Sequence, residues 1–310
     1  MKPHIFSHSS FSIPFPFLSI TEEIDHGLQK YPSMACRWIE TLRRFDGSEM
    51  VFVTTSGVRR DDTLPNQHRM YRVLNETEVG TEGMKYFEEV MGPWSEYFFI
   101  GSPPTVGDFN NDGIDDLVVF GWAEPSHMYL QNSDGTWTEV DIPVTSVTEN
   151  WQGARIGNIT HSPYNDLVIS TGGFTGIQRY YVHVLKGIPD PPYFDFTFPY
   201  YSQRLGTPGL DVEIINVNDD DFADIYVVMM NSVDCDKNSG QTPTVDRARD
   251  ILLVGKEKDG RPGEVTFDRV RMENDLRGCG GFVRKFGDDK TLVLANGNHE
   301  HNGYHYILSW

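Results

Sequence analysis

A short segment that recurs along the chain constrains the fold more than any other feature. The clearest copy, residues 106–120, reads VGDFNNDGIDDLVVF; residues 215–228 read INVNDDDFADIYVV, and residues 156–170 read IGNITHSPYNDLVIS. Residues 45–53 and 286–294 keep the final apolar run but lose the loop before it. Each run of aliphatic residues after a turn-rich stretch is typical of a strand that leaves a loop. The chain is therefore expected to repeat one β-rich unit.

The spacing of the copies indicates the size of that unit. The first apolar residues of the runs are Met50, Leu117, Leu167, Ile225 and Leu292, which are separated by 67, 50, 58 and 67 residues. Such a spacing holds about four short strands and their turns, the content of one propeller blade. The sequence thus predicts an all-β fold, a five-bladed β-propeller with four-stranded blades and a single domain over residues 1–310. The expected blades are residues 35–92, 101–143, 151–199, 209–272 and 279–310.

Turn residues and alternating apolar residues place strands inside the blades. In the second blade we expect strands at 103–109, 116–121, 126–131 and 137–143, the last two joined by a hairpin turn at Asp134-Gly135. In the third blade we expect its outer strands at 180–185 and 193–198. The fifth blade ends one strand short, and residues 11–18 are expected to complete it and close the ring. Pro14 and Pro16 in that segment suit an outermost strand.

These repeats resemble the FG-GAP type found in integrin α-subunit propellers and in bacterial and fungal VCBS-type proteins. Residues 106–120 and 215–228 carry the resemblance most strongly, and residues 128–140 are similar to the third and fourth strands of such a unit. The resemblance implies a β-propeller, and it slightly favours secretion, although residues 1–20 make a poor signal peptide. Integrin propellers have seven blades, so a ring of five differs from them in blade number. This difference weighs against an integrin-like mode of partner binding.

The loop of the clearest copy has the residue pattern of a calcium site. Ca²⁺ prefers six to eight oxygen ligands from carboxylates, amides and main-chain carbonyls. The candidate ligands are Asp108, Asn110, Asp112, the carbonyl of Ile114, and Asp116. Gly113 permits the sharp bend, and Val119 stands where an EF-hand loop would have its last glutamate. The alternative is a solvated acidic turn.

A weaker calcium site is predicted at the equivalent loop of residues 215–228. Its candidate ligands are Asn216, Asn218, Asp220, the carbonyl of Phe222, and Asp224. Asp221 replaces the glycine and fewer carboxylates remain, so the expected affinity is lower. An acidic turn held by Asx hydrogen bonds is the alternative. The loop at 158–166 has a single carboxylate, Asp166, and is expected to be metal-free.

The overall charge excludes some partner classes. The chain has 26 Lys and Arg against 45 Asp and Glu, a net charge of −19, which disfavours nucleic acid and anionic membrane surfaces. No apolar run reaches the ~18 residues that a membrane span needs. Of the cysteines Cys36, Cys235 and Cys279, the first and last would lie on neighbouring first strands of a closed five-bladed ring. A disulfide between them is thus a prediction, with buried thiols as the alternative.

Aromatic and polar residues gather in the segments expected to form one rim of the ring. The ligand-binding candidates are Trp94, Trp122, Trp151, Tyr201, Arg204, His299 and His301. Such side chains suit stacking on sugar rings or enclosing a small molecule, although each could instead pack between blades. We expect a calcium-stabilised module that binds a glycan or protein ligand. The alternative is an enzyme of the lyase or natural-product cyclase type that uses the propeller channel or the rim as a small-molecule pocket.

Overall fold

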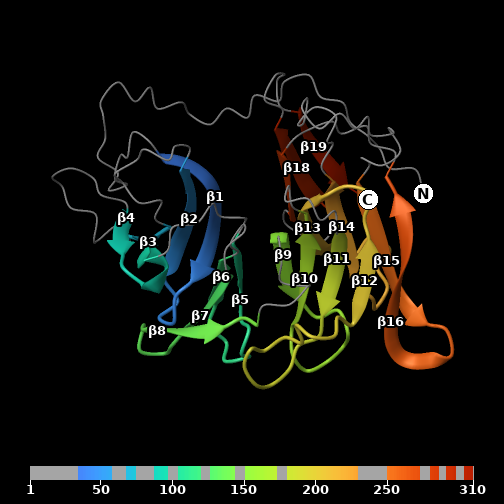
Figure 1. Ribbon diagram of the computed structural model, residues 1–310, viewed down its shortest axis with the longest axis horizontal. Coiled ribbons are helices and arrows are strands. Elements are labelled where there is room, and N and C mark those ends of the chain that lie inside the picture. The colour runs from blue at the N-terminus through green and yellow to red at the C-terminus, as the bar shows by residue number, and fades with distance from the viewer. Residues whose placement is uncertain are drawn as a thin grey trace.

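The computed structural model describes residues 34–57, 68–74, 87–96, 104–119, 126–143, 151–172, 180–229, 250–272, 280–285, 291–297 and 304–309 (Figure 1). Within these ranges the regular structure is nineteen strands and one short 3₁₀ turn, η1 (Pro93–Glu96). The expectation of an all-β protein is confirmed.

The strands form five separate antiparallel sheets, which follow one another along the chain. The first sheet contains β1 (Met34–Arg43), β2 (Glu49–Gly57), β3 (Arg69–Val73) and β4 (Phe87–Val90). The second contains β5 (Thr105–Gly107), β6 (Asp116–Val119), β7 (His127–Gln131) and β8 (Trp137–Asp141). The third contains β9 (Trp151–Gly157), β10 (Asp166–Thr171), β11 (Tyr181–Leu185) and β12 (Tyr201–Arg204).

The fourth sheet contains β13 (Gly209–Ile215), β14 (Asp224–Met229), β15 (Ile251–Lys258) and β16 (Arg261–Arg271). The fifth contains β17 (Gly280–Lys285), β18 (Thr291–Gly297) and β19 (Tyr304–Ser309). Within every sheet each strand pairs with the next one along the chain. The first strands of neighbouring sheets contact one another in order, from β1 through β5, β9 and β13 to β17.

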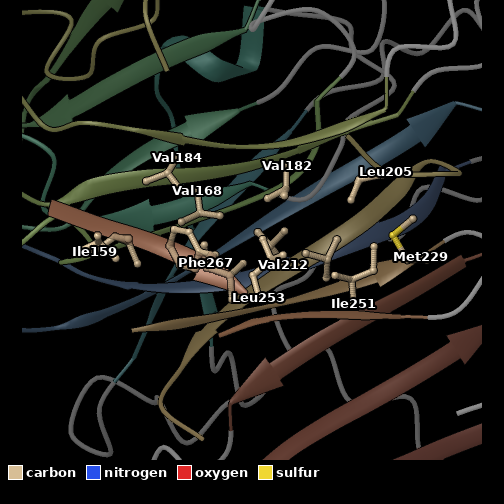
Figure 2. Close-up of a cluster of buried hydrophobic side chains, with 13 residues drawn as sticks. Ile159, Val168, Val182, Val184, Leu205, Val212, Met229, Ile251, Leu253 and Phe267 are labelled. Atoms are coloured by element: carbon tan, nitrogen blue, oxygen red, sulfur yellow. The ribbon is translucent and has the colours of Figure 1, made fainter. Parts of the chain in front are cut away.

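The hydrophobic core lies between the sheets and explains the continuous apolar runs of the repeats. In β14, Ile225 and Val227 pack toward the third sheet, whereas Tyr226 and Val228 pack toward the fifth. Successive side chains of a strand point to opposite faces, so a strand that lies between two other sheets is apolar on both faces. The runs in β6 and β10 are divided between two clusters in the same way. Figure 2 shows the cluster between the third and fourth sheets, with Val168, Val212 and Leu253 facing one another.

The prediction of a strand at 193–198 is wrong. The outer strand of the third sheet is β12, because the segment before it folds into turns. The Asp195 carboxylate accepts hydrogen bonds from the main-chain N–H groups of Thr197 and Phe198, and such local bonds compete with a strand ladder. Phe194 and Phe196 are buried in the core between the second and third sheets. The apolar alternation thus reflects an irregular segment that packs its aromatic rings inward.

Two further predictions involve residues that the structure does not describe. The closing strand at 11–18 lies outside the described residues, and so does Cys279 of the predicted disulfide. Cys36 lies on β1. Among the residues that the structure describes, none belongs to a helix long and apolar enough to cross a bilayer.

Candidate metal centre and ligand-binding surface

The three repeat loops share one backbone feature. Each loop joins the first strand of its sheet to the second, and its fourth residue has a left-handed backbone: φ is 64° at Asn111, 56° at His161 and 59° at Asp219. Asn and Asp tolerate this conformation better than most residues, which accounts for two of the three positions. In the loop at 108–116, Gly113 also has a positive φ of 85°. The loop with the worn sequence, 158–166, therefore folds like the acidic ones.

The last aspartate of each loop is buried and binds main-chain N–H groups. Asp116 accepts hydrogen bonds from Phe109 N (2.9 Å) and from Gln131 N (2.9 Å), the last residue of β7. Asp224 accepts equivalent bonds from Val217 N (2.7 Å) and Gly255 N (2.8 Å). Each carboxylate thus ties its loop to the third strand of its own sheet.

Asp166 repeats this arrangement in the loop expected to be metal-free. Its oxygens accept bonds from Ile159 N (2.9 Å), Thr160 N (2.6 Å) and Gly187 N (3.0 Å), and Thr160 Oγ1 donates a further one at 3.1 Å. Because the same contacts occur in all three loops, the last aspartate has a structural role in each. Such a role does not use every lone pair, since each carboxylate oxygen can accept more than one bond.

Burial works against the charge on Asp116. Burial raises the pKa of Asp116 to about 7, and the nearby Asp112 and Asp108 carboxylates raise it further, against the lowering effect of the two N–H donors. Burial likewise raises the pKa of Asp224, with Asp220 adding to the effect. Negative charge is therefore under-compensated at both loops, which is the electrostatic condition that a bound cation would relieve.

The other candidate ligands of the loop at 108–116 are arranged around the turn. The Asp108 carboxylate accepts bonds from Asp112 N (3.0 Å) and Gly113 N (2.8 Å). Asn110 Oδ1 accepts a bond from Asp112 N at 3.0 Å, and Asn110 Nδ2 donates to Asp112 Oδ2 at 2.9 Å. The N–H of Ile114 donates to Asp112 Oδ1. The oxygen-bearing side chains of residues 108, 110 and 112 thus lie around one exposed turn.

The loop at 216–224 has a similar internal arrangement. Asn218 Nδ2 donates to Asp220 Oδ2 at 2.6 Å, and Phe222 N donates to Asp220 Oδ1 at 2.8 Å. Asn216 Nδ2 donates to the main-chain carbonyl of Asp220 at 2.5 Å. Amide groups thus lie beside the carboxylate at matching positions of both acidic loops.

The oxygen atoms of these loops are of the kind that a hard cation binds, but the carboxylates alone do not form a metal site. Within the described ranges, no three His, Cys, Asp or Glu side chains converge closely enough to hold a metal ion. A cation at residues 108–116 would therefore need amide and main-chain carbonyl oxygens beside the carboxylates. Such a mixed oxygen set is what Ca²⁺ accepts.

Contacts between the loops connect neighbouring sheets. Asn111 Nδ2 donates to Pro163 O at 2.8 Å, and Asn165 Nδ2 donates to Asp108 O at 3.2 Å. The ring of His161 stacks on Phe222, with ring centroids 5.3 Å apart, and its Nε2 lies 3.0 Å from Asp221 O. A cation that fixes one of these loops would therefore also stiffen the junction with the next sheet.

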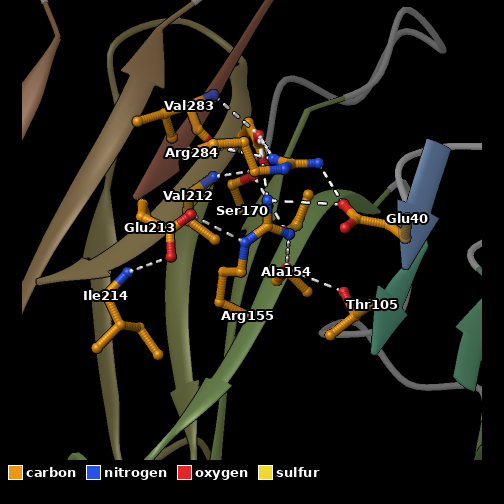
Figure 3. A network of polar contacts seen from close by, with 12 residues as sticks. Glu40, Thr105, Ala154, Arg155, Ser170, Val212, Glu213, Ile214, Val283 and Arg284 are labelled. Atoms are coloured by element: carbon orange, nitrogen blue, oxygen red, sulfur yellow. Dashed lines mark hydrogen bonds and ion pairs between the residues drawn. The ribbon is translucent and has the colours of Figure 1, made fainter. Parts of the chain in front are cut away.

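A network of charged side chains joins the first strands of four sheets (Figure 3). Arg155 on β9 forms ion pairs with Glu213 (3.3 Å) and with the fully buried Asp211 (3.6 Å) of β13. Arg284 on β17 bonds to Asp211 at 2.8 Å and to Glu40 on β1. Burial raises the pKa of Glu40, an effect that the Arg155 and Arg284 charges oppose. The bond between Arg284 and Glu40 connects the fifth sheet to the first.

The predicted aromatic rim needs correction. Trp94 is 1% exposed and lies in the core between the first and second sheets, with its ring against Phe52, Tyr129 and Trp137. Trp151 is fully buried and stacks on Phe196. Neither indole can stack on a ligand in this structure, because the surrounding core already covers it. Trp122, His299 and His301 lie outside the described residues.

Two of the predicted ligand-binding residues are accessible and lie at the two ends of β12. Tyr201 is half-buried and packs its ring on Phe267, with centroids 4.7 Å apart, and Arg204 is exposed at the end of the same strand. Arg269, from β16 of the next sheet, donates from Nη1 to Arg204 O at 3.2 Å. Arg269 and the nearby Arg271 are not among the ligand-binding residues predicted from the sequence. The run Arg269-Val270-Arg271, in which two arginines alternate with an apolar residue, is the pattern that indicates a basic strand face.

Comparison with known proteins gives one family match and distant structural similarities. No curated protein matches the chain. The biofilm matrix protein Bap1 of V. cholerae is similar with a TM-score of 0.39 and 10% identity, over 80% of this chain and 44% of the Bap1 chain. This chain thus spans less than half the length of Bap1. The structure of BBS1N in complex with ARL6DN is similar with a TM-score of 0.34 and 10% identity, over 93% of this chain and 94% of BBS1N. The family model of the FG-GAP-like repeat matches residues 108–169, so the resemblance seen in the sequence is confirmed for this segment.

Proposed function

We propose that this chain is a calcium-stabilised, five-bladed β-propeller that serves as a binding module for a glycan or protein ligand. The observation that carries the proposal is the loop at 108–116. It lies within the segment that matches the FG-GAP-like repeat, and it gathers carboxylate, amide and carbonyl oxygens around one turn beside a buried, under-compensated aspartate.

Closure of the ring is supported by the order of contacts. The first strands of successive sheets contact one another from β1 to β17, and Arg284 then returns to Glu40 on β1. Hydrophobic clusters fill the four junctions between consecutive sheets. A closed ring would protect the sheet edges that an open row leaves exposed.

Calcium would act on structure rather than on chemistry. Asp108, Asp112 and Asp116, with Asn110 and the carbonyl of Ile114, would hold the ion in the loop of the second sheet. The loop of the fourth sheet would hold a second, weaker ion through Asp220 and Asp224. Since these loops also contact their neighbours, bound ions would stiffen the junctions between neighbouring sheets.

The calcium proposal is tested by thermal unfolding of the chain with added Ca²⁺ and with a chelator. An ion that binds only the folded state stabilises it by about 2.7 kcal/mol at a hundredfold excess over Kd, so Ca²⁺ should raise the melting temperature. Asp112→Asn should lose most of this shift, whereas Asp141→Asn, at an exposed position on the end of β8 that lies opposite His127 and away from the loop, should keep it. Equal melting curves with Ca²⁺ and with the chelator would contradict the proposal.

The binding function is tested separately by probing glycan and protein arrays with the labelled chain in Ca²⁺. Specific signals that vanish on thermal unfolding of the chain are expected. A folded, calcium-loaded chain that gives no specific signal on either array would overturn the binding function and leave the calcium result untouched.

A further inference from the structure

The described part of the molecule contains a cluster of arginines that has no carboxylate partner. Arg204 on β12 and Arg269 and Arg271 on β16 are all exposed, and within the described ranges none of them forms an ion pair. The other cations of the β15–β16 hairpin are paired: Lys256 with Asp268 at 2.8 Å, and Arg261 and Lys258 with Glu264. The acid next to them along the strand, Asp268, lies on the opposite face of β16 and is paired with Lys256.

The contacts place this cluster between the outer strands of two sheets. Arg269 reaches across from β16 to the carbonyl of Arg204 at the end of β12. Tyr201 packs on Phe267, which lies two residues before Arg269 on the same face of β16, so the aromatic contact borders Arg269. Burial lowers the pKa of Arg269, and the nearby Arg271 charge lowers it further, against a raising effect of Tyr201. Two like charges on one face of a strand favour a bound anionic group.

The strand that carries two of the arginines is also a sheet edge. β16 is the last strand of the fourth sheet, and it pairs only with β15 among the strands that the structure describes. An edge strand presents N–H and C=O groups that an extended peptide can join. On β16 the Tyr200 hydroxyl already accepts a bond from Val265 N and donates one to Val265 O, so the part of the edge open to a peptide lies beyond Val265, where the arginines are. Arg269 and Arg271 are two residues apart, so they point to the same face of the strand and are separated by about 6.8 Å along it.

From this juxtaposition we infer that an acidic peptide in extended conformation adds to the outer edge of β16, with alternate carboxylates facing Arg269 and Arg271. An added strand has the same two-residue spacing as β16, so acidic residues at every second position meet the arginines in register. Guanidinium groups bind carboxylates through paired hydrogen bonds, and Arg204 extends the basic surface onto the third sheet. This inference rests on the proposed binding function and names its partner class.

The inference is tested with the full chain and a fluorescent octapeptide of alternating Thr and Glu, by fluorescence anisotropy at low salt. The alternating peptide should bind, whereas the same composition with all Glu before all Thr, and the Thr–Gln analogue, should bind at least about tenfold more weakly. Arg269→Gln with Arg271→Gln should weaken binding by at least about tenfold. Lys256→Gln removes the same charge from the same hairpin but faces the opposite side of the sheet, so it should leave the Kd unchanged.

Two further measurements keep the result interpretable. Arg271→Gln alone removes an exposed side chain that makes no hydrogen bond within the described residues, so it tests the surface even if the double variant unfolds. Peptide addition should slow amide hydrogen exchange in β16 and not in β8, the outer strand of the second sheet. Binding without this protection would overturn strand addition.

The outcomes separate this inference from the proposed function. Equal affinity for the alternating, block and neutral peptides, or affinity that survives the double variant, overturns the acidic-peptide assignment. So does binding of heparin, a sulfated polysaccharide, through the same arginines without binding of the peptide. In either case a positive array signal would still support a binding module, whereas a blank array would contradict the module whatever the peptide does.

Discussion

One buried carboxylate organises the chain around each of the three repeat loops. Asp116, Asp166 and Asp224 each accept an N–H bond from the second residue of the loop and another from the third strand or just beyond it. The geometry is the same whether the loop is rich in acids or nearly free of them. The last aspartate of the repeat is therefore required by the fold, and metal binding is an additional property of the loops that carry more oxygen ligands.

Asp166 gives the clearest test of this structural role, because its loop has no other acid. Asp166→Asn keeps the size of the side chain but replaces one acceptor oxygen with a donor that faces N–H groups. We expect the free energy of unfolding to fall by about 2–3 kcal/mol, the cost of leaving buried donors without a charged acceptor. Urea unfolding measures the loss, and Asp141→Asn, at an exposed position on β8, should change stability by less than about 0.5 kcal/mol. Equal stability of the two variants would contradict the structural role.

His183 provides a prediction about pH. Burial lowers its pKa to about 4 from an ordinary 6.5, and its Nδ1 lies 2.8 Å from Ser202 Oγ. The unfolded chain therefore binds the proton more readily, so stability is complete above pH 6.5 and is lost as the pH falls from 6.5 toward 4. The expected contribution between pH 7 and pH 4.5 is on the order of 2 kcal/mol.

The matched variant for this prediction is His183→Gln, which can retain a hydrogen bond to Ser202 but does not titrate. Its stability, from urea unfolding at pH 7 and pH 4.5, should fall less than that of the unmodified chain. Asp116, with its raised pKa, acts in the opposite direction, since protonating it relieves a buried charge. Only the difference between the two proteins therefore isolates His183. Parallel pH profiles would show that His183 titrates normally in the folded chain.

The residue types were readable from the sequence, but their environments were not. The spacing of Asp108, Asn110 and Asp112 correctly indicates a tight loop, which the bonds to Asp112 N and Gly113 N confirm. Spacing cannot tell whether Asp116 faces a cation or the end of β7, because the same loop position serves both. The sequence predicts Trp94 and Trp151 on a rim because they lie in segments that connect the expected strands. Their burial depends on which core those segments pack against, and a linear pattern does not contain that information.

At the scale of elements, the repeat predicted the sheets better than their edges. The second and third strands of the three repeats are continuous apolar runs because the second, third and fourth sheets each lie between two others, and those runs are visible in the sequence. The outer strands have weaker patterns, since one edge faces away from the sheet. This explains why the outer strand of the third sheet lies at Tyr201–Arg204 and not at the predicted 193–198. The alternation at 193–198 is strand-like, but the hydrogen bonds of Asp195 fold this segment into turns.

Close approach of first strands makes one glycine irreplaceable. A Cβ atom at Gly153 on β9 would lie 2.7 Å from the Cα atom of Asp211 on β13, which is main chain and cannot turn aside. Gly153→Ala should push the two strands apart and lower the free energy of unfolding by about 1–3 kcal/mol, as overpacking does elsewhere. Denaturant unfolding gives the value, with Gln152→Ala on the same strand as the control. Unchanged stability of the glycine variant would mean that the third and fourth sheets are not packed this closely.

For the whole molecule, a network of buried charges links sheets that are far apart in the sequence. Clusters of apolar side chains fill the junctions between consecutive sheets, and among the residues that the structure describes the ion pair of Arg284 with Glu40 joins the fifth sheet to the first. Asp211 is fully buried and bonds to Arg284, so the charges depend on one another. The sequence could not reveal this network, because Glu40 and Arg284 are 244 residues apart and neither belongs to a motif.

A double-mutant cycle on Glu40→Gln and Arg284→Gln tests whether this pair holds the fifth sheet to the first. Removing either partner takes one opposite charge from the other, which keeps only Arg155 beside Glu40 or Asp211 beside Arg284. Each single variant should therefore lose stability, and the coupling energy should exceed about 1 kcal/mol. The exposed pair of Arg72 and Glu88, between the outer strands of the first sheet, is the matched control, with an expected coupling below about 1 kcal/mol. Amide hydrogen exchange should show the loss of protection concentrated in β1 and β17, because these strands carry Glu40 and Arg284. Coupling no larger than that of the surface pair, or protection lost evenly over all five sheets, would mean that this contact does not hold the fifth sheet to the first.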